Sequence, residues 1–136
     1  MSGTEENSWL IDLILSFFHS LEWKAPVLSF IETKCASFDD ETENKLEYTV
    51  IHKEFKEMTE GLIEGMLKEL GASNDDFGAA FEEANKTVGF QKVSKIIESI
   101  DNFEIFKKMM VKKNEALNKE AIEMMQAKEE SLKNQP

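Results

Sequence analysis

The fold is decided by residues 48–70, which read YTVIHKEFKEMTEGLIEGMLKEL. Apolar side chains recur in this segment at intervals of three and four, the spacing that places them on one face of an α-helix. Gly71 follows, and glycine suits the left-handed conformation that ends many helices. The segment therefore predicts a long helix with one face in a core and the other in solvent. The core face comprises Ile51, Phe55, Met58, Leu62, Met66 and Leu70.

Two helices are expected before this segment. Apolar residues between Leu10 and Leu21 have helical spacing, with a narrower opposite face. Pro26 suits the first turn of a second helix, whose apolar repeat runs from Val27 to Phe38. We expect the two helices to form a hairpin. The narrower face of the first is marked by Asp12, Ser16, His19 and Trp23.

Three helices are expected after Gly71. Ser73 and Asp76 have the spacing of a capping box that opens a short helix, and Gly89 separates it from the next one. Asp101 and Glu104 predict a second capping box at the start of a long final helix. No segment alternates with a period of two, so the prediction is an all-α fold with six helices in one bundle. We expect its domain to cover residues 9–127, between a disordered start (1–8) and a frayed or disordered tail (128–136).

Length, charge and cysteine content exclude several classes of protein. The 136 residues suffice for one domain with a real core. The net charge of −11 makes nucleic acid an unfavourable partner, because its phosphates are repelled. The most apolar run, Trp9 to Phe18, contains Asp12 and is too short to cross a membrane, so we expect no membrane insertion. The single Cys35 cannot form an intramolecular disulfide, which favours a reducing, intracellular environment.

The sequence contains no recognisable catalytic or metal-binding motif. Its two histidines, His19 and His52, each lie inside a helical pattern without a flanking motif, and a phosphate loop, a paired-cysteine site and HExxH are absent. A calcium loop starting at Asp39 would place Asn44 where the turn requires Gly and Val50 where a bidentate Glu is required. We therefore expect a protein that is not an enzyme and binds no cofactor or metal.

The most polar segment is residues 39–45, DDETENK, with four carboxylates against one lysine. It fits either a solvated connector or a charged docking loop. The methionines allow the same two interpretations, because Met fills cores and also lines grooves that receive an amphipathic helix. Periodicity leaves both alternatives open. The six internal methionines are Met58, Met66, Met109, Met110, Met124 and Met125.

Residues 38–55, FDDETENKLEYTVIHKEF, resemble the signature of the BART family, in which a Phe and an acidic run precede Glu-Asn-Lys-Leu, a Tyr-Thr pair and an aromatic helix. A second match is found at residues 101–114, DNFEIFKKMMVKKN. The opening, Trp9 to Ile31, is similar to the first two helices of the branch associated with cilia and flagella. The resemblance covers about residues 9–127.

This resemblance implies a six-helix bundle that acts as a non-enzymatic effector or adaptor of GTP-bound ARF-like GTPases of type two or three. It also implies a cytoplasmic protein of the cilium or flagellum. In that family the GTPase inserts its N-terminal amphipathic helix into an apolar groove, while polar residues meet its switch surface. Carried onto this chain, the acidic signature is Phe38, Asp39, Asp40, Glu41, Glu43 and Asn44, and the helix start is Leu46, Tyr48, Ile51 and Phe55. The candidate groove is Met58, Leu62, Phe77, Phe81, Phe103, Phe106 and Met110.

The alternative interpretation is a structural module that self-associates through Met110, Leu117 and Met124, which lie seven residues apart. The adaptor interpretation predicts a monomer and the structural one a dimer. Light scattering distinguishes them.

Overall fold

The computed structural model describes residues 8–39, 46–86 and 88–134. These residues contain helices and turns but no strand, which confirms the all-α prediction. The long helix predicted for residues 48–70 is α4, which begins two residues earlier, at Leu46. The elements are α2 (Ser8–Phe18), α3 (Leu21–Lys34), the 3₁₀ turn η1 (Cys35–Ser37), α4 (Leu46–Leu70), α5 (Asn74–Ala84), the 3₁₀ turn η2 (Val88–Phe90), α6 (Gln91–Asp101) and α7 (Phe103–Lys133).

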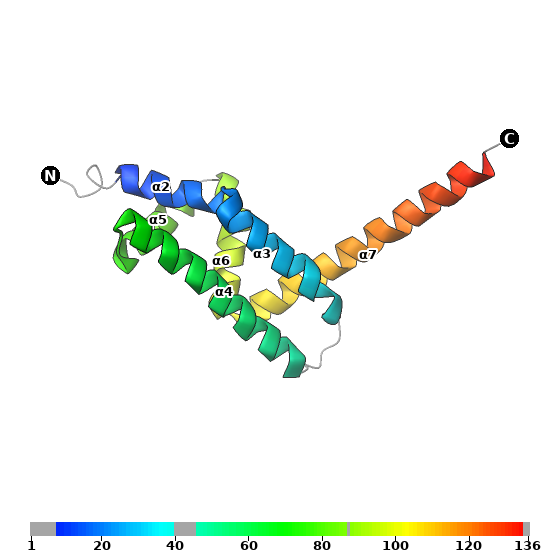
Figure 1. Ribbon diagram of the computed structural model, residues 1–136, viewed down its shortest axis with the longest axis horizontal. Coiled ribbons are helices and arrows are strands. Elements are labelled where there is room, and N and C mark those ends of the chain that lie inside the picture. The colour runs from blue at the N-terminus through cyan, green and yellow to red at the C-terminus, as the bar shows by residue number, and fades with distance from the viewer. Residues whose placement is uncertain (1–7, 40–45, 87, 135–136) are drawn as a thin grey trace.

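The predicted hairpin of the first two helices is wrong. One tight turn joins α2 to α3, in which the His19 N–H donates to the Ser16 carbonyl (3.1 Å) and the Ser20 N–H to the Phe17 carbonyl (3.0 Å). This turn bends the chain without reversing it, so α3 leads away from the end of α2 (Figure 1). Since α2 and α3 form one bent rod, the described residues make five helical rods instead of the predicted bundle of six.

The start of α3 also differs from the prediction. Pro26 lies inside the helix, because α3 begins five residues earlier, at Leu21. Trp23, predicted on the narrower face opposite the apolar repeat, is 1% exposed. Its ring packs edge-on against Phe18, with centroids 4.8 Å apart. Burial of a Trp side chain is a large favourable term, and it draws this turn of α3 into the core.

The core lies where the bent rod, α4, α6 and the first half of α7 meet. In the view of Figure 1, α6 lies between the bent rod and α4 and leads into the start of α7. Side chains from all four contribute to one cluster, so these elements share a single hydrophobic core. Its largest fully buried members are Trp23, Tyr48, Phe18, Phe38, Phe55 and Phe106.

The helix ends test the predicted caps. Gly71 has φ +68°, and the Ala72 N–H donates to the Leu67 carbonyl at 2.8 Å, which is a Schellman ending. The capping box of Ser73 and Asp76 is confirmed, with both of its hydrogen bonds present. The second predicted box is wrong, because α6 continues through Asp101 and Asn102 caps α7 instead. The Asn102 Oδ1 accepts from the Ile105 N–H at 3.1 Å.

The second half of α7 extends beyond the other helices. Its first half packs on α3, α4 and α6, whereas every described residue from Asn118 onward is exposed. Figure 1 shows this second half projecting away from the other helices. Across the described residues, no helix combines the length and apolar character needed to cross a membrane.

Candidate partner-binding site

The residues that lead into the acidic segment are clamped between α4 and α7. The Phe38 side chain is fully buried and stacks on the Tyr48 ring, with centroids 4.3 Å apart and planes 15° apart. From α7, the Asn114 Nδ2 donates to the Phe38 carbonyl at 2.7 Å, across 76 residues of sequence. Phe38 is therefore fixed from both sides, through its ring and its backbone.

Asp39 is held by Tyr48. The Tyr48 hydroxyl donates to the Asp39 Oδ1 (3.1 Å) and accepts from the Asp39 N–H (3.3 Å). This pair of bonds sets the direction in which the chain leaves the core at the acidic segment. The other residues of the predicted acidic signature lie outside the described residues: Asp40, Glu41, Glu43 and Asn44.

The start of α4 separates into a buried and an exposed face. Tyr48, Ile51 and Phe55 are buried, and Phe55 packs against Phe106 with ring centroids 5.0 Å apart. Leu46 is 81% exposed and Val50 is 50% exposed, so two apolar side chains one turn apart face solvent beside the acidic segment. Sequence reasoning missed Val50, although its position four residues after Leu46 was the available signal.

A cleft with both apolar and polar lining lies between α4, α5 and α6, with a volume of about 380 Å³. Ile63, Phe77, Ile97 and Ile100 supply its apolar lining. Its rim carries three carboxylates, and we call it the acidic-rimmed cleft. The rim residues are Glu60, Glu64 and Asp101.

One lysine partly offsets this negative charge. The Lys56 Nζ lies 2.9 Å from the Asp101 Oδ1 and 3.8 Å from the Glu60 Oε1. The hydrogen bond to Asp101, followed by the charges of Asp101 and Glu60, raises the pKa of Lys56. Three carboxylates against one ammonium leave the cleft with a negative excess, which favours basic groups on an occupant.

The seven predicted groove residues are divided by the structure. Phe77 lines the acidic-rimmed cleft. Phe106 and Met110 are fully buried and serve the core in this conformation. Ile63, Ile97 and Ile100 line the cleft but were not among the candidates, because their helical spacing equally fits core positions. The remaining four candidates, Met58, Leu62, Phe81 and Phe103, are half-buried and pack against the core.

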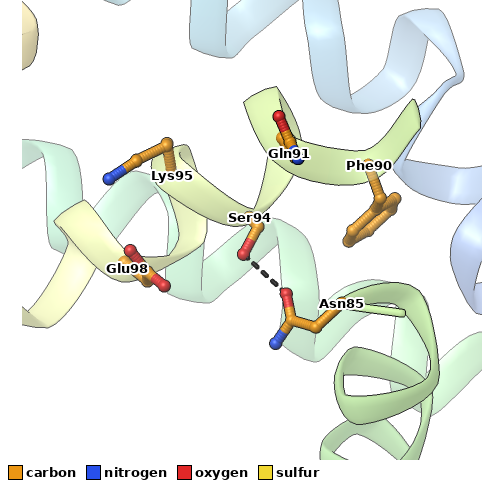
Figure 2. Close-up of a pocket in the computed structure, with 6 residues that line it drawn as sticks. All are labelled: Asn85, Phe90, Gln91, Ser94, Lys95 and Glu98. Carbon is orange, nitrogen blue, oxygen red and sulfur yellow. Dashed lines mark hydrogen bonds between the residues drawn. The ribbon is translucent and has the colours of Figure 1, made fainter. Parts of the chain in front are cut away.

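A smaller pocket of about 180 Å³ lies between the end of α5 and α6. Within it the Ser94 hydroxyl donates to the Asn85 Oδ1 at 2.8 Å, and Figure 2 shows this bond bridging the two elements. The same view shows Lys95, the residue after Ser94, and Glu98, one turn further along α6. The bond fastens α6 to α5, so we assign this pocket a structural role.

His52 and Cys35 both have contacts that serve the packing of the fold. The His52 ring bonds to the Ser99 carbonyl through Nε2 at 2.8 Å, which joins α4 to α6. Cys35 is buried, and this burial raises the pKa of its thiol, so the reactive thiolate is disfavoured. In the part of the chain that the structure describes, no group of three His, Cys, Asp or Glu residues could hold a metal ion.

Comparison with known proteins gives two matches. Residues 6–119 match the family described as the ARF-like 2 binding protein BART. Cilia- and flagella-associated protein 36 of Caenorhabditis elegans is 30% identical over 120 residues, covering 86% of this chain and 18% of that protein. The chain therefore spans less than a fifth of that relative's length.

Proposed function

Because the chain belongs to the family of BART, the ARF-like 2 binding protein, we propose that it is a non-enzymatic adaptor for an ARF-like small GTPase. The proposed partner is the GTP-bound form, of type two or three, bound by a monomer of this chain. We propose residues 9–127 as the partner-binding domain. The site of action is the cytoplasm of a cilium or flagellum, in keeping with the name of the relative.

The observation that carries the proposal is that α4 joins two surfaces suited to one partner. Its start presents Leu46 and Val50 beside the clamped Asp39. About fifteen residues later the same helix contributes Glu60 and Ile63 to the acidic-rimmed cleft. At 1.5 Å per residue the two surfaces are about 20 to 25 Å apart, which a small globular protein with a terminal helix can span.

In this proposal the acidic segment and the start of α4 meet the switch surface of the GTPase. Its N-terminal amphipathic helix enters the acidic-rimmed cleft and places apolar side chains on Ile63, Phe77 and Ile97. Burial of apolar area supplies most of the affinity, and basic residues flanking that helix pair with the rim. Phe38, Tyr48, Phe55, Phe106 and Met110 position these surfaces from the core.

The deciding experiment is calorimetric titration with ARF-like GTPases loaded with a non-hydrolysable GTP analogue or with GDP. We expect binding to the GTP form, reduced more than about tenfold when the N-terminal helix of the GTPase is deleted, because several apolar side chains lose their burial. Equal binding of the helix-deleted GTPase would refute the role of the cleft. Absence of binding to any ARF-like GTPase would refute the proposal itself.

Two neighbouring residues of α6 provide a matched pair for this test. Ile96 and Ile97 are both half-buried, but of the two it is Ile97 that lines the acidic-rimmed cleft. Ile97→Gln should weaken GTPase binding, whereas Ile96→Gln should leave it unchanged at a similar cost in stability. Equal effects of the two variants would mean that the cleft does not receive the GTPase.

The exposed end of α7 favours the alternative function, a structural module that self-associates. Of the predicted seam, Met110 is fully buried and Leu117 half-buried, so Met124 alone is available together with other residues of this end. Every described residue from Asn118 onward is exposed. Four apolar side chains in this part of the helix are each more than half exposed: Ile122, Met124, Met125 and Leu132. Two such helices could pair as a coiled coil. A concentration-dependent dimer in light scattering, abolished by Met124→Glu and Met125→Glu, would support this function over the monomeric adaptor.

A further inference from the structure

Helix α6 borders a second cleft on a different side from the acidic-rimmed one. This cleft lies between α3 and α6 and has a volume of about 460 Å³. Ile96 lines it, whereas Ile97 lines the acidic-rimmed cleft. Consecutive residues of an α-helix point about 100° apart, so adjacent isoleucines can serve two separate surfaces.

The second cleft combines an apolar lining with a basic rim. Leu28, Val93 and Ile96 contribute apolar surface, and Leu28 is 44% exposed. Lys24 from α3 and Lys92 from α6 are exposed at its edges. Among the described residues that line it, the titratable groups are these two lysines and His19, without a carboxylate. We call it the basic-rimmed cleft.

This local charge is opposite to that of the molecule. The chain as a whole carries 27 acidic and 16 basic residues. An anionic partner must therefore be attracted locally at the basic-rimmed cleft, because the net negative charge of the molecule repels an anion that approaches elsewhere. The two clefts thus call for occupants of opposite charge.

We propose that the basic-rimmed cleft docks an acidic amphipathic helix of a partner protein. Leucine-like side chains of that helix lie on Leu28, Val93 and Ile96, and flanking Asp or Glu residues pair with Lys24 and Lys92. The exposed apolar surface continues along α3 to Leu21, seven residues before Leu28, and 80% of Leu21 is accessible. Leu21 and Leu28 thus mark two helical turns of apolar surface, with Lys24 between them. A surface of this length can contact apolar side chains at positions i, i+3 and i+7 of a docked helix.

Trp23 gives a direct measurement, because it lines this cleft and is one of two tryptophans. Trp9→Phe removes the other, which is 60% exposed, and leaves an emission signal from the cleft alone. The probe is a synthetic helical peptide with Leu at i, i+3 and i+7 flanked by Glu. Its control carries Gln at every Glu position.

We expect the acidic peptide to shift the Trp23 emission and to bind more tightly than the Gln peptide. Lys24→Glu with Lys92→Glu should weaken it by about tenfold, since two exposed attractions become repulsions. The matched control is Lys108→Glu with Lys112→Glu, which changes the net charge equally at exposed positions of α7 outside the cleft and should leave binding unchanged. Ile96→Gln should weaken the peptide, and Ile97→Gln should not.

Equal affinity for the acidic and Gln peptides, or for the two double-lysine variants, would overturn the proposal. So would an emission shift by laurate but not by the peptide, which would assign the cleft to an anionic lipid. A dimer of the unliganded protein that Lys24→Glu with Lys92→Glu dissociates would assign it to a second copy of this chain. None of these measurements requires the GTPase, so failure here is separable from failure of the adaptor function.

Discussion

Asn114→Ala should loosen the connection between α7 and the chain that enters the acidic segment. The substitution removes the amide that donates to the Phe38 carbonyl at 2.7 Å. Phe38 is fully buried, so its carbonyl loses its partner in a place that water reaches poorly. A buried acceptor left without a hydrogen bond costs about 1 to 3 kcal/mol.

Part of this cost is offset within the helix. Ala is more favourable than Asn in a helix interior by up to about 0.7 kcal/mol. The expected net loss in unfolding free energy is therefore about 0.5 to 2.5 kcal/mol. For a domain of this size that corresponds to a fall in Tm of about 2 to 8 °C.

Urea denaturation followed by circular dichroism measures the loss directly, with the slope of the transition expected to stay the same. Asn118→Ala is the control one turn further along α7. Asn118 is exposed, and the hydrogen bond from its Nδ2 to the Asn114 Oδ1 is long, at 3.4 Å. Its replacement should therefore not lower stability. Equal urea midpoints for Asn114→Ala and Asn118→Ala would refute a stabilising role of the hydrogen bond between Asn114 and Phe38.

Four further outcomes are expected. Phe106→Ala should cost about 3 to 5 kcal/mol of unfolding free energy in urea, because a fully buried ring is deleted. Gly65→Ala, which meets open space within α4, should add about 0.5 to 1 kcal/mol in the same assay, whereas Gly71→Ala, at φ +68°, should destabilise. Cys35, buried with a raised thiol pKa, should react with a thiol reagent at pH 8 far more slowly than in urea. Replacing Asp40, Glu41 and Glu43 by Ser should slow GTPase association at low salt in surface plasmon resonance; unchanged rates would make the segment a connector.

The sequence was most informative where local chemistry decides the structure. The apolar repeat of α4, its glycine ending at Gly71 and the box of Ser73 and Asp76 depend on residues within one or two turns, and all are confirmed. The second box failed for a non-local reason. Asp101 remains in α6, where it pairs with Lys56 of α4, and Asn102 takes the capping position.

Periodicity could not predict how the helices are arranged relative to one another. Helical spacing identified Phe18 as buried, but whether the chain reverses or merely bends after it depends on what Trp23 packs against. The acidic signature was readable as a motif, while its clamp joins Phe38 to Asn114 across 76 residues, a distance at which sequence patterns carry no signal. That clamp is the feature that links the motif to the core.

The two clefts explain why a surface can be hidden in an apolar repeat. Ile96, Ile97 and Ile100 have the spacing of core residues, and Ile100 is indeed only 5% exposed. Because α6 lies between α3 on one side and α4 with α5 on the other, its apolar residues fill the floor of two openings as well as the core. Part of the charge that gives each opening its character comes from other helices. Glu60 and Glu64 of α4 join Asp101 of α6 on one side, and Lys24 of α3 joins Lys92 of α6 on the other. Specificity therefore arises from the packing of helices around α6, so a substitution on α3 or α4 can change which partner is accepted without altering α6 itself.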